Sequence, residues 1–325
     1  MTSPRSSRLT ADGRRPSLFD LQVNGFGGID FQAAELPAAA LRQAVDALRR
    51  HRIHRILLTL ITDEIEALCR KLEQLEAHRR QDPVVAETLA GYHLEGPYLS
   101  PAAGYCGAHP VELVRPPSGR ELARLAEAAQ GRLRLITLAP EWPGSAEFIA
   151  EARSRGIVIA LGHTQANEAE IDAAVAAGAT LCTHLGNAVP MVLPRHDNVL
   201  QRLLARDELT ACLIPDGLHL PPYVLKNLYR AKPAGRVVLT SDCMAAAGAP
   251  PGRYAIGRLR VEVGADGVVR EPGKPNFAGS SLTLDRGVAN AARWLGLPTD
   301  DAWHLASQAV ADLFQIELPW VEVDG

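Results

Sequence analysis

Short apolar runs alternate with longer amphipathic segments along most of this 325-residue chain. The apolar runs have the length of strands, and the segments between them repeat apolar residues at helical spacing, which is typical of strand–helix units with parallel strands. Eight such units in succession predict an α/β fold of the (β/α)8 TIM-barrel type. We expect its strands near residues 18–23, 53–60, 88–94, 132–138, 157–162, 180–184, 210–215 and 236–241.

The remaining segments complete this predicted domain. Helices are expected at about 38–50, 63–80, 119–129, 145–155, 167–177, 199–206, 221–231, 282–295 and 299–314. Between Asp242 and Ser280, the stretch GRYAIGRLRVEVGADGVVREPG alternates apolar and polar residues around Ala-Asp-Gly, which predicts a β-hairpin inserted after the eighth strand. Residues 1–17 are polar and basic, so we expect a disordered tail there and a single barrel domain over 18–325.

Charge and composition exclude several classes of partner. Thirty-four basic and 37 acidic residues are mixed along the chain, for a net charge of -3, so no basic stripe indicates nucleic-acid binding. No apolar run approaches the roughly 20 residues needed to span a membrane. The five cysteines are odd in number and show no CxxC spacing, which argues against a disulfide framework and favours a cytoplasmic location.

The stretch over residues 157–187 places a histidine after each of two neighbouring predicted strands. One apolar run ends at Gly162-His163-Thr164, and the next ends at Thr183-His184. Because the carboxyl ends of barrel strands share one rim, both imidazoles are expected to face the same mouth. Two imidazoles there suit a catalytic zinc or iron ion. The alternative is that each histidine caps a turn.

Acidic residues follow two other predicted strands. Glu95 ends the third strand, where a carboxylate is costly to bury unless it is paired or metal-bound, so it is the third candidate ligand. His93 lies deeper in the same strand and is expected to support a ligand or pack in the core. Asp242 follows the eighth strand, where it can take a proton from water and pass it to a leaving amine. Asp242 can instead be the N-cap of the following Met-Ala-Ala-Ala run.

Neutral and basic candidates complete the predicted rim. Alternation places Gln22 and Asn24 on the same side of the first strand, although Asn24 can instead belong to an Asn-Gly turn. Arg195, in a loop after the sixth strand, is either a clamp for phosphate or carboxylate or a solvated surface residue. His219 is expected at the rim after the seventh strand.

Taken together, these segments resemble the amidohydrolase superfamily and, within it, the N-acetylglucosamine-6-phosphate deacetylases. The likeness follows the family order over about residues 18–316. It is carried by DLQVNGFGGIDF, YHLEGPYLSP with GAHP, LAPE, GHTQANEAEIDAAVAAGATLCTHLGNAVP, PDGLHL, LTSDCMAAAG and FAGSSLTLDRGV.

The resemblance implies a site and a reaction. Glu95, His163 and His184 would hold one divalent metal ion, usually Zn2+, and Asp242 would be the general acid/base. Substrate contacts would come from Gln22, Ala108, His109, Asn187, Ala188, Arg195, His219, Phe277, Ala278 and Gly279. The implied reaction is hydrolysis of the N-acetyl amide of an amino sugar phosphate, with His109 or His219 helping the metal to stabilise the oxyanion.

Several departures from the family pattern keep the substrate open. Two-metal relatives carry His-x-His on strand one and a modified lysine on strand four, whereas this chain has Gln22-Val23-Asn24 and Leu-Ala-Pro-Glu there, which favours one metal. The chain also has too few residues outside the predicted barrel for the family's small β-sandwich, Gly186 replaces an aromatic residue, and the surroundings of Arg195 differ.

These departures leave three functional hypotheses open. The first is a deacetylase of an amino sugar phosphate, and the second is the same chemistry on another N-acyl substrate. The third is a catalytically inert barrel that binds a sugar phosphate. Relatives are often dimers, so a homodimer is also expected.

Overall fold

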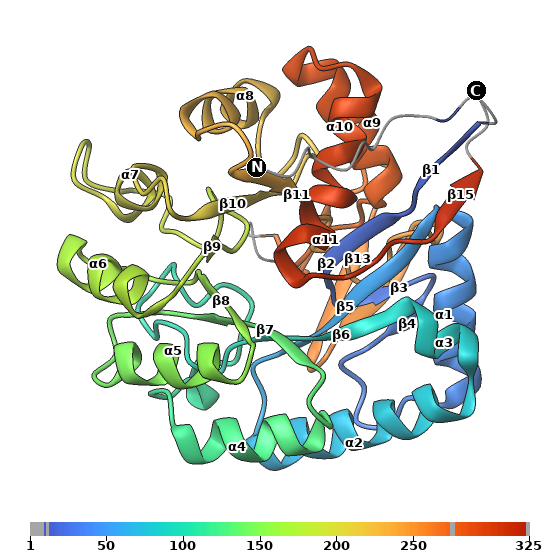
Figure 1. The fold of residues 1–325 in the computed structure, drawn as a ribbon, viewed down its shortest axis with the longest axis horizontal. Coiled ribbons are helices and arrows are strands. Elements are labelled where there is room, and N and C mark those ends of the chain that lie inside the picture. Colours follow the sequence, from blue (N-terminus) through green and yellow to red (C-terminus); the bar gives the residue numbers. More distant parts are fainter. Residues whose placement is uncertain (1–9, 11–12, 274–276, 323–325) are drawn as a thin grey trace.

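Eight parallel strands form the predicted barrel in the computed structural model, which describes residues 10, 13–273 and 277–322 (Figure 1). Neighbours in the sheet follow the chain order: β2 (Leu18–Val23), β5 (Ile53–Ile61), β6 (Leu89–Glu95), β7 (Leu133–Leu138), β8 (Val158–Leu161), β9 (Leu181–Cys182), β10 (Thr210–Leu213) and β11 (Val237–Leu239). The last and first strands meet through a single bridge between Val23 and Cys243, so the barrel is nearly closed.

Helices surround the strands, as the amphipathic pattern predicts (Figure 1). They are α1 (Ala38–Arg50), α2 (Ile65–Gln81), α3 (Pro83–Thr88), α4 (Gly119–Ala128), α5 (Ser145–Ser154), α6 (Glu168–Ala177), α7 (Val199–Leu204), α8 (Pro222–Ala231), α9 (Leu284–Leu295), α10 (Thr299–Leu305) and α11 (Gln308–Phe314), with a 3-10 turn at Val111–Leu113. Their ends follow local chemistry: the Asn167 side chain and Glu170 form a capping box at α6, and Gly178 ends that helix at a φ of 112°.

Two helical predictions need correction. The helix expected over 299–314 is two helices, because Ser307 has a φ of -135° and a ψ of -97°, which are not helical. No glycine or proline marks this break in the sequence. The helix α3 was not predicted, and the side chain of Asp82 starts it by accepting hydrogen bonds from the backbone of Val84 and Val85.

Three smaller sheets accompany the barrel within the described residues. The predicted hairpin insertion is a three-stranded antiparallel sheet, β12 (Gly252–Ile256), β13 (Leu259–Val263) and β14 (Val269–Arg270). The Ala-Asp-Gly turn joins β13 to β14, and a second turn at Gly257 was missed. Strands β3 (Gly25–Phe26) and β4 (Ile29–Asp30) form a short hairpin after β2.

The end of the predicted tail is part of the third small sheet. Strand β1 (Arg14–Pro16) pairs antiparallel with β15 (Trp320–Glu322), and the indole N–H of Trp303 donates to the Pro16 carbonyl at 2.8 Å. Residues 1–9 and 11–12, where the rest of that prediction falls, lie outside the described residues.

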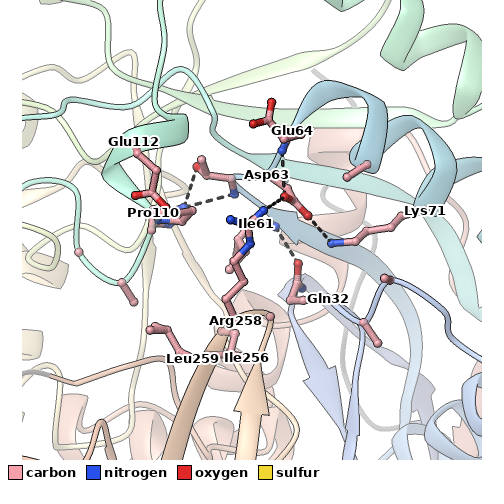
Figure 2. A pocket seen from close by; sticks show the side chains of 18 of the residues that line it. Gln32, Ile61, Asp63, Glu64, Lys71, Pro110, Glu112, Ile256, Arg258 and Leu259 are labelled. Atoms are coloured by element: carbon pink, nitrogen blue, oxygen red, sulfur yellow. Dashed lines mark hydrogen bonds and ion pairs between the residues drawn. The ribbon is translucent and has the colours of Figure 1, made fainter.

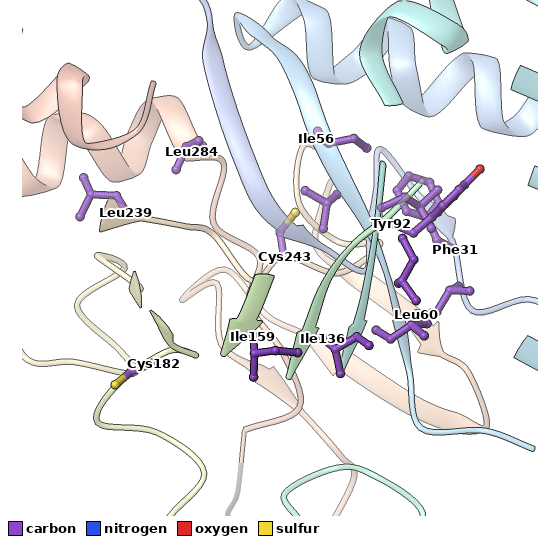
Figure 3. Close-up of a cluster of buried hydrophobic side chains, with 14 of the residues drawn as sticks. Phe31, Ile56, Leu60, Tyr92, Ile136, Ile159, Cys182, Leu239, Cys243 and Leu284 are labelled. Atoms are coloured by element: carbon purple, nitrogen blue, oxygen red, sulfur yellow. The ribbon is translucent and has the colours of Figure 1, made fainter. Parts of the chain in front are cut away.

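Alternating side chains of the strands build two apolar layers. One set, including Leu57, Leu135 and Val238, fills the barrel interior and packs with Phe314 of α11. The opposite set faces the helices, and Figure 3 shows part of this layer around Ile56, Leu60, Tyr92, Ile136 and Ile159. Burial of both layers stabilises the barrel and leaves its polar strand ends to form the rim.

Candidate metal centre and active-site cavity

Glu95, His163 and His184 converge as predicted at the carboxyl ends of three neighbouring strands. The Oε1 atom of Glu95 lies 3.2 Å from Nε2 of His163 and 2.9 Å from Nε2 of His184, and the two Nε2 atoms are 3.1 Å apart. All three side chains are buried. One carboxylate and two imidazoles at this spacing match the donor set of a catalytic zinc site that keeps an open position.

Hydrogen bonds on the far side of the His163 ring fix its tautomer. Its Nδ1 atom lies 2.9 Å from the carbonyl oxygen of Tyr105. Because a carbonyl only accepts, Nδ1 carries the proton, and Nε2 of the neutral ring presents a lone pair to the cluster. Burial alone would raise the pKa of Glu95, but the surrounding imidazoles, that of His109 foremost, hold this pKa well below its ordinary value. The cluster therefore offers one anion and free lone pairs to a cation.

Asp242 faces this cluster from the end of β11. Burial and the negative charge of Glu95 raise the pKa of Asp242 to about 8. The Nδ2 atom of Asn24 donates to Oδ1 of Asp242 at 2.8 Å. A buried carboxyl group with a raised pKa beside a cation site can both accept and return a proton.

Three of these residues have a left-handed backbone conformation. The φ angles of His163, His184 and Asp242 are 52°, 27° and 50°. This conformation is unfavourable for residues with a Cβ atom, and it concentrates at functional sites where the surrounding structure imposes it. The chain thus turns sharply at the strand ends and directs these side chains into the barrel mouth.

His109 has the tautomer opposite to that of His163. Its Nδ1 atom lies 3.4 Å from the backbone N–H of Thr62, a donor, and 2.9 Å from the Thr62 hydroxyl. An Nδ1 atom that accepts leaves the proton of the neutral ring on Nε2. That Nε2 atom is 3.6 Å from Oε2 of Glu95. His109 can therefore donate a hydrogen bond into the space beside the cluster.

A cavity of about 620 Å3 opens above the cluster. Its lining includes Glu95, His163, His184 and Asp242 together with these predicted substrate contacts: Ala108, His109, Asn187, Ala188, His219, Phe277 and Gly279. The Nδ1 atom of His219 lies 2.6 Å from Oδ2 of Asp216, which orients the ring. This cavity is large enough for a sugar phosphate.

Three other predicted substrate contacts do not line this cavity. The Gln22 carboxamide is fully buried and donates to Oε1 of Glu95 at 2.9 Å, so it supports a candidate metal ligand. Ala278 packs in an apolar cluster with Met244. Arg195 is exposed on the loop after β9 and is not part of the lining.

A second cavity of about 700 Å3 adjoins the first, and Figure 2 shows it from close by. Both cavities are lined by Ala108 and His109. In Figure 2, Asp63 lies between two cations: its Oδ2 atom is 2.9 Å from Nζ of Lys71, and its Oδ1 atom is 3.1 Å from a guanidinium nitrogen of Arg258. Because Asp63 pairs with both, these two side chains contribute little free positive charge.

Sequence reasoning missed other polar residues that support the site. His93 was expected to lie deep, and it contacts the hydroxyl groups of Thr59 and Thr137 at 3.3 and 2.8 Å. The contact of Thr62 with His109 was missed, as was the contact of Asp20 with the segment before Asp242. Thr62 directly follows the apolar strand β5, whereas the one sequence signal of Asp20 is an acidic residue within the apolar strand β2.

Fold and site define the class of protein. A barrel with a glutamate, two histidines and an aspartate at the carboxyl ends of four strands is a hydrolase of the amidohydrolase type. No protein-family model matches the chain.

Comparison with known proteins identifies the family. N-acetylglucosamine-6-phosphate deacetylase of Danio rerio is 34% identical over 316 residues, which cover 93% of this chain and 75% of the relative. The N-acetylgalactosamine-6-phosphate deacetylase of Escherichia coli O157:H7 is 30% identical, with 93% and 78% covered. The structure of a mutant Mycobacterium smegmatis N-acetyl-D-glucosamine-6-phosphate deacetylase in complex with N-acetyl-D-glucosamine-6-phosphate superposes with a TM-score of 0.84, at 34% identity, covering 95% and 80%. This chain belongs to the N-acetylglucosamine-6-phosphate deacetylase family.

Proposed function

We propose that this protein hydrolyses the N-acetyl amide of N-acetylglucosamine-6-phosphate, which yields glucosamine-6-phosphate and acetate. The observation that carries the proposal is the convergence of Glu95, His163, His184 and Asp242 in one cavity, in a chain whose relatives bear the name of that activity. The presence of all four chemically necessary side chains argues against an inert binding barrel.

We propose one divalent metal ion, most simply Zn2+, at Glu95, His163 and His184. Zn–N and Zn–O bonds of about 2.0–2.2 Å in a tetrahedral site put ligand atoms about 3.3 Å apart. The three separations here are 2.9, 3.1 and 3.2 Å, so the donors fit such an ion after shifts of a few tenths of an ångström. When bound, such an ion would lower the pKa of water to about 7 and so supply a nucleophile at neutral pH.

The protein's own residues would carry the protons. Asp242 accepts a proton from the attacking water as the water oxygen bonds to the acetyl carbon. The Nε2–H group of His109 donates to the carbonyl oxygen, where negative charge develops. Asp242 then returns its proton to the sugar nitrogen as the C–N bond breaks, so that acetic acid and the free amine leave, and the acid loses its proton to water as acetate.

For substrate binding, we propose hydrogen bonds from Asn187, His219 and the backbone near Ala188 and Gly279, which line the cavity. Arg195 remains our candidate for the phosphate, on the family resemblance. Its side chain would have to reach the cavity from an exposed position. The galactose epimer, N-acetylgalactosamine-6-phosphate, is a second candidate substrate, because a 30% identical relative is named as its deacetylase.

The test is a substrate panel on zinc-loaded protein, with release of free amine as the readout. We expect turnover of N-acetylglucosamine-6-phosphate that exceeds turnover of its galactose epimer and of unphosphorylated N-acetylglucosamine. Equal rates with and without phosphate would favour another N-acyl substrate. Stoichiometric zinc without turnover of any member would favour an inert binding barrel.

We also propose a cytoplasmic homodimer. All five cysteines are free and buried, which suits a reducing compartment. The apolar side chains of Met191 and Val192 are almost fully exposed beside the cavity, which supports contact with a second copy.

Within the described residues, no helix is both long and apolar enough to pass through a lipid bilayer.

A further inference from the structure

Asp242 lies where the first and last strands of the barrel come together, a place that we call the barrel joint. Seven neighbouring pairs of barrel strands form ladders, whereas the end of β2 meets the segment after β11 through one bridge, in which the N–H of Asn24 donates to the Cys243 carbonyl at 2.7 Å. Asp242 itself has a φ of 50°, which L-residues adopt only when their surroundings impose it. Other contacts must therefore hold this residue in place.

Asp20 of β2 holds the backbone on both sides of Asp242. Its Oδ1 atom accepts from the Thr240 hydroxyl at 2.7 Å and from the N–H of Ser241 at 3.2 Å, and its Oδ2 atom accepts from the Ser241 hydroxyl. The Ser241 hydroxyl oxygen in turn accepts from the N–H of Cys243 at 3.1 Å. The residues before and after Asp242 are thus connected to one carboxylate.

Besides these contacts, the Asp20 carboxyl group accepts a hydrogen bond from the N–H of Gln22 at 3.3 Å. Asp20 is fully buried, and its contacts are hydrogen bonds from hydroxyl and backbone N–H groups. A buried anion held only by neutral donors is costly for a folded protein. It is therefore expected where a specific geometry depends on it.

Asn24 of β2 holds the side chain of Asp242. In the structure the amide nitrogen of Asn24 donates to Oδ1 of Asp242, at 2.8 Å. The amide oxygen of Asn24 is buried without a hydrogen-bond partner among the described residues. Asn24 lines the cavity beside Asp242. With Oδ1 occupied by this donor, Oδ2 is the oxygen left for proton transfer.

We propose that Asp20 and Asn24 are positioning residues for the proposed general acid/base, Asp242: Asp20 fixes its backbone across the barrel joint, and Asn24 selects which carboxylate oxygen exchanges the proton. The proposal rests on the proposed deacetylase function. Neither residue needs to touch the substrate for this role.

The first test compares Asn24→Ala and Asp20→Asn with the wild type at saturating zinc and varied N-acetylglucosamine-6-phosphate. We expect kcat to fall about 10–100-fold, as for other residues that orient reacting groups, with KM changed less than about 3-fold and bound zinc unchanged. If Asp20→Asn folds poorly, Ser241→Ala takes its place, because it removes the hydroxyl that connects Asp20 to Cys243. We expect the same fall in kcat for this variant. Gln308→Ala is the matched control, since this amide is also buried and donates to Asp312 at 2.6 Å within α11.

The second test places each change in an Asp242→Asn background. If Asp20 and Asn24 act through Asp242, neither change lowers the residual rate further. Equal fold losses in both backgrounds, or an unchanged kcat in the single variants, would overturn the proposal.

Crystal structures separate this proposal from the proposed function. In Asn24→Ala, the carboxylate of Asp242 should leave its observed rotamer, and in Asp20→Asn or Ser241→Ala its φ should depart from 50°. If the wild type releases no amine from any substrate, the deacetylase assignment fails, and these structures still decide the role of the two residues. An unmoved Asp242 in every variant would refute it.

Discussion

Removal of one imidazole from the candidate metal centre tests the site most directly. In His163→Ala, the ring that lies 3.2 Å from Glu95 and 3.1 Å from His184 is lost, so two of the three protein donors remain. A cation that binds only the folded state stabilises it by about 2.7 kcal/mol when its concentration is 100 times its Kd. Unfolding entropy of about 2.1 cal/mol/K per residue gives roughly 0.7 kcal/mol/K for 325 residues. Zinc should therefore raise the Tm of the wild type by about 4 °C.

For His163→Ala we expect at least a 100-fold weaker affinity, since a change in a supporting residue alone often weakens a metal site about 10–100-fold. At the same zinc concentration the stabilisation then falls to about 0.4 kcal/mol, which corresponds to a Tm shift below about 1 °C. Differential scanning calorimetry of each variant with and without zinc measures this shift, and elemental analysis gives the zinc content. His54→Ala is the control, because His54 lies near the amino end of β5, away from the rim. A full shift in His163→Ala, or a lost shift in His54→Ala, would refute the assigned ligands.

Three further changes test the neighbouring parts of the structure. Asp242→Asn should lower kcat about 10²–10⁴-fold, the usual contribution of general acid–base catalysis, while zinc content measured on the same sample stays the same; loss of zinc would instead make Asp242 a ligand. Thr62→Val removes the hydroxyl 2.9 Å from Nδ1 of His109, so we expect about a 10-fold lower kcat in steady-state assays and a KM close to that of the wild type. Trp303→Phe removes the hydrogen bond to the Pro16 carbonyl and should lower the free energy of unfolding in urea by about 1–3 kcal/mol without a change in kcat; an unaltered stability would show that the β1–β15 pair contributes little.

The candidate ligands were predictable because their signal is local. Glu95, His163 and His184 each end an apolar run, and a parallel barrel brings the carboxyl ends of all its strands to one rim. The glycines and amphipathic segments between these runs carry equally local signals. Such features require no knowledge of which distant residue lies opposite.

The features that the sequence did not reveal depend on partners far along the chain. Arg14–Pro16 reads as part of a polar tail, and its strand partner comes about 300 residues later. Gln22 has the alternation of a rim residue, but an extra residue in β2 relative to β5 and the proximity of Glu95 decide that its amide supports a carboxylate. The break at Ser307 is marked by neither glycine nor proline, so the apolar pattern predicts one helix across it.

The amides of β2 explain how one cation can serve a site with two buried carboxylates. In two-metal relatives, as the family resemblance implies, histidines take the positions of Gln22 and Asn24 and bind a second cation. Here the Gln22 amide donates to Glu95 and the Asn24 amide donates to Asp242, at 2.9 and 2.8 Å. Each neutral donor offsets part of the desolvation of its carboxylate without adding a charge. The donors also leave lone pairs of Glu95 for the proposed ion and one oxygen of Asp242 for the proton. The same two positions that would bind a metal in those relatives thus orient the general acid/base and a ligand of the one-metal site that we propose.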